Sequence, residues 1–216
     1  MKRRDVLLGL AVSPLAAALP ARAQEQYPAR PIRLVIPFAP GGTADVIGRP
    51  VAQRLGELLG HTLVADNRGG AGGAVAAGIV AKAVPDGYTI ILGSSGAFTI
   101  SPSLGAKLPY DPVADFAPIG LIAASQFILV VHPSVPAQSV RELVALAKSR
   151  ASRLTYGSAG NGNVGHLAGE LFKSLAGVDL VHVPYKGAGP MTVDLLAGQV
   201  ELGFPGLSSL VPHVKA

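Results

Sequence analysis

Two glycine-rich turns constrain the fold of this chain more than any other feature. They read PFAPGGTAD at 37–45 and YGSAGNGNVGH at 156–166, and each joins an apolar run of strand type to a helical pattern. Glycine lets the backbone adopt positive φ angles and approach a ligand closely. The first N–H groups of the helix that follows are unsatisfied and lie at the positive end of its dipole. Each turn therefore predicts a place for a carboxylate or phosphate.

The energy available at one such turn is small. A charge at a helix end contributes roughly 0.3 to 2 kcal/mol, whereas a micromolar ligand requires about 8 kcal/mol. Two turns that close over a small acid and exclude water supply more than one turn alone. The pair therefore favours two sides of one ligand-binding cleft, while each turn taken singly is equally well explained as a plain link between strand and helix.

Short apolar strands alternate with helical patterns along the rest of the chain. This order predicts an α/β fold with a mainly parallel sheet. Pro50 falls inside the first expected helix and predicts a kink there or a late start. We expect strands at 32–38, 62–66, 89–93, 119–123, 127–132, 154–157 and 180–183, and helices at 43–59, 72–83, 139–149, 164–175 and 190–196.

The N-terminus has the pattern of an export signal. Lys2, Arg3 and Arg4 precede an apolar run at 6–19, and Ala21-Arg22-Ala23 matches a cleavage site. We expect residues 1–23 to be a signal peptide cleaved after Ala23, which places the protein in the periplasm. The apolar run is short and contains a proline, so a retained membrane span is the weaker interpretation. The two arginines leave both the general secretory and the twin-arginine route open.

Removing the signal changes the charge argument. The whole chain carries a formal charge of +5, and residues 1–23 hold four basic residues and one acidic residue, so the remainder is close to neutral at +2. With no dense basic run and no tryptophan, a nucleic-acid partner is not expected. The absence of cysteine excludes a disulfide framework and thiolate metal sites.

An enzyme is the competing function class. Gly160-x-Gly162-x-x-Gly165 matches a dinucleotide-binding fingerprint, but the next strand ends in Pro184-Tyr185-Lys186 where an acidic residue would bind the ribose. No nucleophile elbow, P-loop or zinc-protease motif is present. We therefore expect no catalytic residue, no metal and no cofactor. The histidines are scattered, and only His166, beside the second turn, is favoured to brace that turn or reach a ligand.

Six segments together carry a family resemblance. PFAPGGTAD, DNRGGAGGAVAAGIVAKAVPDGYT, LPYDPVADFAPIGLI, YGSAGNGNVGH, VPYKGAGPMTVDLLAGQVEL and PHVKA occur in this order. They resemble the substrate-binding proteins of tripartite tricarboxylate transporters, the Bug family, over essentially the whole chain after the signal. The resemblance implies a periplasmic binding protein of type II with two α/β domains and a hinge. It further implies a monomer that captures a small carboxylated metabolite for the membrane subunits of such a transporter.

The resemblance also implies which residues bind the ligand. In the family the carboxylate is held largely by backbone amides and bridging waters from one turn in each domain. For Asp45 there is a second interpretation besides ligand contact. An acidic residue at a helix start braces its loop more readily than it contacts an anionic ligand. Lys186 could pair with a distal carboxylate. The ligand-binding set is Phe38, Ala39, Pro40, Gly41, Gly42, Thr43, Asp45, Ser94, Gly157, Ser158, Ala159, Gly160, Asn161, Gly162, Asn163 and His166.

The chain departs from the family pattern at three internal positions. Gly69 stands where a proline is usual, and Asn163 stands where a serine is common. Pro205-Gly206 replaces an acidic and an amide residue that often occur there, which removes a partner for a ligand ammonium group. The change at Pro205-Gly206 predicts a non-amino carboxylic acid as ligand.

The expected domains are 24–121 and 122–216, the first lacking its C-terminal return and the second its last strand. Relatives continue beyond the PHVKA segment with a strand that crosses back to the first domain, whereas this sequence stops at Ala216. A C-terminally truncated product, which need not function alone, is therefore a further interpretation.

Overall fold

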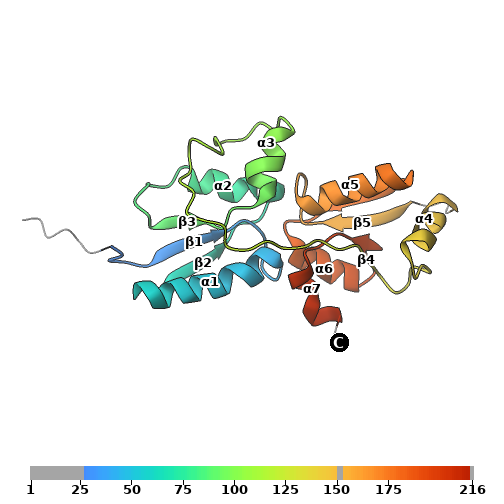
Figure 1. Cartoon of the computed structure of the whole chain (residues 1–216), viewed down its shortest axis with the longest axis horizontal. Helices are drawn as coiled ribbons and strands as arrows, with labels where there is room; N and C mark the ends of the chain where they lie inside the picture. The colour runs from blue at the N-terminus through green and yellow to red at the C-terminus, as the bar shows by residue number, and fades with distance from the viewer. Residues whose placement is uncertain (1–26, 150–152, 215–216) are drawn as a thin grey trace, which may run out of the picture.

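The computed structural model describes residues 27–149 and 153–214, and the expected signal peptide lies outside them. Two sheets lie side by side, and each has its own covering helices (Figure 1). We call the elements from β1 to α3 the first lobe and those from β4 to α7 the second lobe. A long stretch at 104–129 connects them. The predicted α/β class is confirmed.

The first lobe is built on a parallel sheet in the order β2-β1-β3. Its central strand β1 is apolar except at Arg33, which pairs with Asp66 of β2, because helices cover both faces of the sheet. Ile36 and Val35 are fully buried there. The elements are β1 (Ile32–Ile36), α1 (Thr43–Leu59), β2 (Leu63–Asn67), η1 (Ala71–Gly73), α2 (Ala74–Val80), β3 (Thr89–Ile91), the π-helix η2 (Gly96–Ile100) and α3 (Ser101–Ser103).

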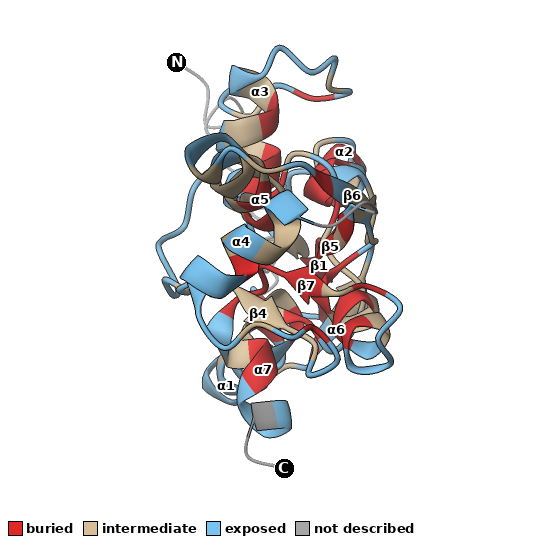
Figure 2. Ribbon diagram, turned by 90° about the vertical axis from the view of Figure 1, so that its right-hand side faces the viewer, coloured by how far each residue is buried: buried red, intermediate tan, exposed pale blue. Residues whose placement is uncertain are grey.

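The second lobe has the sheet order β4-β7-β5-β6, in which β4 is antiparallel and the others are parallel. Tyr156 and Leu202 are completely buried at its centre, and Phe204 packs beside them. Figure 2 shows buried stretches of the chain in red, with β7 among them. The elements are β4 (Val130–Val131), α4 (Val140–Ser149), β5 (Leu154–Ser158), α5 (Val164–Ala176), β6 (Leu180–Pro184), α6 (Ala188–Leu196), β7 (Leu202–Gly203) and α7 (Leu207–Val214).

Most of the expected elements are present with similar bounds, and the differences have physical causes. The strand expected at 119–123 is wrong: Ile119 and Leu121 are 86% and 91% exposed, and residues 117–126 pair with neither sheet. A strand needs a neighbour for its backbone groups, which an apolar pattern alone does not supply. The late start expected for the first helix is also wrong, because α1 begins at Thr43 and includes Pro50. The turn-rich reading of 94–115 missed η2 and α3.

Candidate ligand-binding site

The first glycine turn links β1 to α1 and is held in shape by Asp45. One Asp45 carboxylate oxygen accepts hydrogen bonds from Gly41 N (3.1 Å) and Arg49 Nε (3.0 Å), and the other accepts from Asn67 Nδ2 (2.9 Å). Asn67 also donates to the Phe38 carbonyl at 3.0 Å. Asp45 therefore braces the turn from behind, as the sequence suggested.

Asp45 stays ionised in this position. Burial by itself would raise its pKa, since the residue is only 7% exposed. Hydrogen bonds from Arg49, Gly41 and Asn67 together outweigh burial and hold the pKa of the carboxyl below its ordinary value. A negative charge fixed by three donors near the start of α1 is a bracing group and leaves little acceptor capacity for a ligand.

The second glycine turn links β5 to α5 and is held by three side chains. Ser158 Oγ accepts from Gly160 N at 3.1 Å, and His166 Nδ1 accepts from Gly162 N at 3.3 Å. Asn163 is the N-cap of α5, where its Oδ1 accepts from His166 N at 2.9 Å. The amide that replaces the family's usual serine thus serves the helix start.

These bonds decide which backbone N–H groups remain for a ligand. The N–H groups of Ala39, Gly41, Gly160, Gly162 and Asn163 all donate within the protein. In the described part of the chain, the first N–H groups of α1 (Thr43, Ala44) and of α5 (Val164, Gly165) donate no recorded hydrogen bond. The sequence interpretation missed Ala44, Val164 and Gly165, although unpaired donors at helix starts are a general property.

Both turns lie where the two lobes meet. Figure 1 shows that α1 and α5 begin at this junction and run away from it. Ala39 N donates to the Lys186 carbonyl at 3.0 Å, which joins the first turn to the second lobe. A Cβ built on Gly160 in the second turn would lie 2.9 Å from the Tyr185 carbonyl oxygen and 3.3 Å from Gly72 N of the first lobe. The segment 185–189 therefore borders both turns.

Glycines line this junction from both sides. A Cβ on Gly189 would overlap the Pro40 carbonyl oxygen, and one on Gly72 would overlap the Asn161 carbonyl oxygen. Gly69, the departure from proline, fits against the Lys186 carbonyl in the same way. Backbone thus meets backbone across the lobes, and an added side chain at these positions would force them apart.

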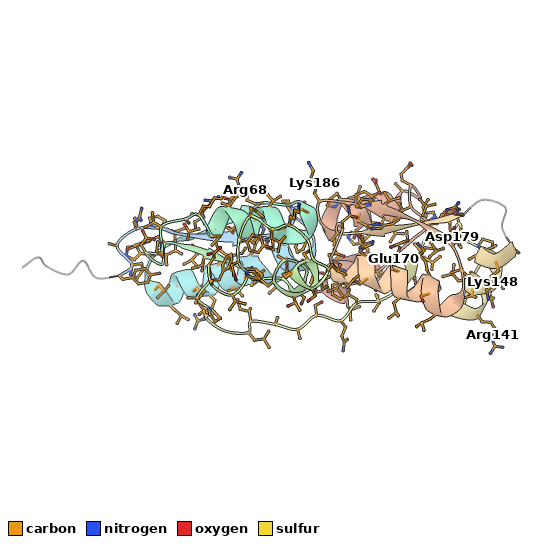
Figure 3. All side chains as sticks on the ribbon, turned by 90° about the horizontal axis from the view of Figure 1, so that it is seen from above. Arg68, Arg141, Lys148, Glu170, Asp179 and Lys186 are labelled. Carbon is orange, nitrogen blue, oxygen red and sulfur yellow. The ribbon has the colours of Figure 1, made fainter. Side chains whose placement is uncertain are left out.

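Ser94, Gly206 and Lys186, which the sequence also singled out, differ in burial and in hydrogen bonding. Ser94 Oγ is buried, has no hydrogen-bond partner among the described residues, and lies 3.0 Å from where a Cβ of Gly73 would be. Gly206 borders the first turn, since Thr43 Oγ1 donates to its carbonyl at 3.5 Å. Lys186 is exposed and extends outward at the junction (Figure 3). The described residues include no cluster suited to a metal ion.

The hollow of about 370 Å³ at the other end of α1 is a separate feature. Its lining runs from Ala52 to Leu63 and includes no residue of either turn. The candidate site is therefore defined by the helix starts and their turns.

His182 lies next to the second turn, and its pKa is lowered there. Burial lowers the pKa of His182, the neighbouring His166 lowers it further, and the value falls to about 4. Glu170 opposes this shift and Lys173 adds to it. At neutral pH the His182 ring is therefore uncharged.

This pKa predicts a loss of stability in acid. The unfolded chain binds a proton at this histidine near pH 6.5 and the folded chain only near pH 4, so the stabilisation from the neutral ring is complete above pH 6.5 and is lost as the pH falls toward 4. We expect the free energy of unfolding to fall by about 2 kcal/mol from this group over that range. Urea unfolding at pH 7.0 and 4.5 measures it. In His182→Gln, the decrease should be smaller by that amount, and equal decreases in both proteins would contradict the assignment.

Comparison with known proteins identifies the family. Residues 47–216 match the family described as the tripartite tricarboxylate transporter family receptor. The chain belongs to this family. The resemblance seen in the sequence is confirmed, and the family and fold are those of transporter binding proteins.

Solved structures agree with this assignment. The periplasmic binding protein BugD superposes with a TM-score of 0.83 at 36% identity, covering 88% of this chain and 63% of BugD. Rpa4515 of R. palustris, solved with adipate, gives 0.82 at 40% identity, covering 88% and 63%. MatC of Rhodopseudomonas palustris, solved with bound malate, gives 0.82 at 33% identity, covering 88% and 64%.

The chain spans only part of the length of its relatives. BugT of Bordetella pertussis is 35% identical over 217 aligned residues, which cover 100% of this chain and 66% of BugT. The chain spans 63%, 66% and 60% of the length of three curated relatives that it matches. Within residues 27–149 and 153–214, no helix has the length and apolar character needed to cross a membrane.

Proposed function

We propose that this protein is a periplasmic solute-binding protein that captures a small carboxylated metabolite by closing its two lobes, as two domains, around the ligand. The observation that carries the proposal is the position of α1 and α5, which start at one junction with their first N–H groups unpaired. Two helix starts directed at one place bind an anion without needing a cationic side chain. Adipate and malate in the structures of Rpa4515 and MatC support a carboxylate.

The residues proposed to bind the carboxylate differ in part from the set that the sequence indicated. The N–H groups of Gly42 and Thr43, together with those of Ala44, Val164 and Gly165, face a ligand as donors. Ser94 contributes its unpaired hydroxyl. The side chains of Asp45, Ser158, Asn163 and His166 act behind the turns, because each is already engaged with the turn backbone.

The ligand class follows from the acceptors near the first turn. An amino acid needs an acceptor for its ammonium group, and an unpaired buried charge is strongly unfavourable. Asp45 is occupied by three donors, and position 205–206 offers Pro205 and Gly206 without a polar side chain. We therefore propose a non-amino carboxylic acid.

The cellular setting is proposed on the same basis. We propose export through the signal at residues 1–23, action as a monomer, delivery to the membrane subunits of a tripartite tricarboxylate transporter, and no enzymatic turnover. The family description and the periplasmic relatives support this setting.

Calorimetric titration tests the proposed ligand class. The purified protein is titrated with malate and adipate, and with aspartate and glutamate as amino-acid counterparts of similar length. We expect at least one of the first pair to bind at one site per chain and to be recovered chemically unchanged. Binding of amino acids alone, or conversion of the bound acid, would overturn the proposal.

A further inference from the structure

His182 connects the strand before the second glycine turn with the helix after it. Tyr156 on β5 and His182 on β6 are partners in the parallel register, and their rings stack with centroids 4.8 Å apart. The His166 ring on α5 stacks on His182 at 4.2 Å with an interplanar angle of 21°. One imidazole therefore contacts side chains from both elements that flank the turn.

The side chains that His182 touches are those that hold the turn amides. His182 Nε2 lies 2.7 Å from Ser158 Oγ, which is completely buried. The same hydroxyl accepts from Gly160 N at 3.1 Å and donates to the Gly160 carbonyl at 3.2 Å. His166, stacked on His182, accepts from Gly162 N. Removing a partner from a buried hydroxyl is unfavourable, because water cannot replace it. Loss of His182 would therefore leave the Ser158 hydroxyl bonded only to Gly160, which belongs to the turn itself, so the hydroxyl would no longer anchor the turn to β6.

We propose that His182 is a positioning residue for ligand binding, which fixes the second glycine turn through Ser158 and His166 and so aims the first N–H groups of α5 at the ligand. The proposal rests on the proposed function and deepens it, since His182 itself lies behind the turn. No local sequence motif marks this histidine as functional.

The surroundings of His182 fit this task. Tyr156 on β5 and His166, Glu170 and Lys173 on α5 are the titratable groups that face it. Glu170 is held by the Tyr156 hydroxyl (2.7 Å) and by Lys173 Nζ (3.0 Å). Burial and His166 lower the pKa of His182 and keep its ring neutral, which is the form that packs between the Tyr156 and His166 rings without burying a charge.

Three substitutions separate positioning from a merely structural role. His182→Phe keeps a stacking ring and removes the nitrogen that meets Ser158. His182→Gln places an amide nitrogen at about the reach of Nε2. Leu180→Val is the matched control. Leu180 is a buried core residue of the same strand, and its apolar side chain cannot hydrogen-bond to Ser158 or His166. If His182→Phe does not fold, His182→Asn replaces it, since its shorter side chain withdraws the amide from Ser158.

The experiment combines malate and adipate titration with amide hydrogen exchange at Gly160 and Gly162. We expect His182→Phe to weaken binding of the preferred acid about tenfold, in line with the loss of one buried hydrogen bond. We expect exchange at both glycines to accelerate about tenfold. His182→Gln should restore both quantities to within about threefold of the native values. Leu180→Val should lower the unfolding midpoint and change neither.

Three outcomes would overturn the role of His182. They are unchanged exchange in His182→Phe, failure of His182→Gln to restore it, and equal losses in Leu180→Val. If the native protein binds neither acid, the proposed function fails at that point. The exchange comparison still decides whether His182 fixes the turn, so the two failures are distinguishable.

Discussion

Gly189→Ala is expected to weaken carboxylate binding at least tenfold, the consequence of roughly 1 to 3 kcal/mol of overpacking. A methyl group at this position overlaps the Pro40 carbonyl oxygen across the lobe junction and lies 3.3 Å from Gly41 C. These are backbone atoms, so no side-chain rotation relieves the contact. The lobes must separate, and the first turn moves away from the second.

Helix propensity cannot explain such a loss. Gly189 lies inside α6, where alanine is a better helix former than glycine by about 1 kcal/mol. The variant should therefore fold with a similar unfolding midpoint while binding poorly. Gly120→Ala is the matched control, because a Cβ there meets nothing within 4 Å. Titration of both variants with malate and adipate measures the effect. Native affinity in Gly189→Ala would mean that the lobes do not need this contact to bind.

Tyr156→Ala is expected to produce the largest loss of stability, about 4 kcal/mol. Tyr156 is completely buried in the second lobe, and its ring packs edge-on to Phe204 at 6.1 Å and stacks on His182. Its hydroxyl donates to Glu170 Oε1 at 2.7 Å. Burial and the Glu170 bond both raise the pKa of this hydroxyl, so it remains a donor at any pH of interest.

Thermal unfolding checks this prediction. For a chain of this size the loss corresponds to a midpoint lower by roughly 10 °C. Tyr156→Phe keeps the ring and removes only the hydroxyl, so it should cost about 1 kcal/mol. Equal midpoints for the two variants would show that the ring does not fill the core as described.

The sequence allowed the strands and helices flanking both turns to be predicted closely. α1 begins at Thr43 and ends before Gly60, which adopts the left-handed conformation that only glycine favours. α5 is closed by Gly177 in the same way. These helix ends depend on a few neighbouring residues, so they can be predicted from the local sequence. The strand expected at 119–123 failed because a strand depends on a partner that local sequence does not reveal.

The sequence predicts a region for the proposed site, and the structure changes which N–H groups are available there as donors. The sequence placed ligand contacts at Gly41, Gly160 and Gly162, whose N–H groups are engaged by Asp45, Ser158 and His166. Those bonds depend on the folded path of each turn. His182 escaped notice because its importance comes from the register of β5 against β6, which pairs it with Tyr156.

The most direct test of the account follows the backbone amides of isotope-labelled protein by NMR during titration with malate and adipate. The account predicts that the N–H signals of Thr43 and Ala44 in one lobe and of Val164 and Gly165 in the other shift together and saturate at the same ligand concentration. Shifts confined to one turn, or binding that leaves all four signals in place, would contradict the claim that two helix starts hold one carboxylated ligand between the lobes.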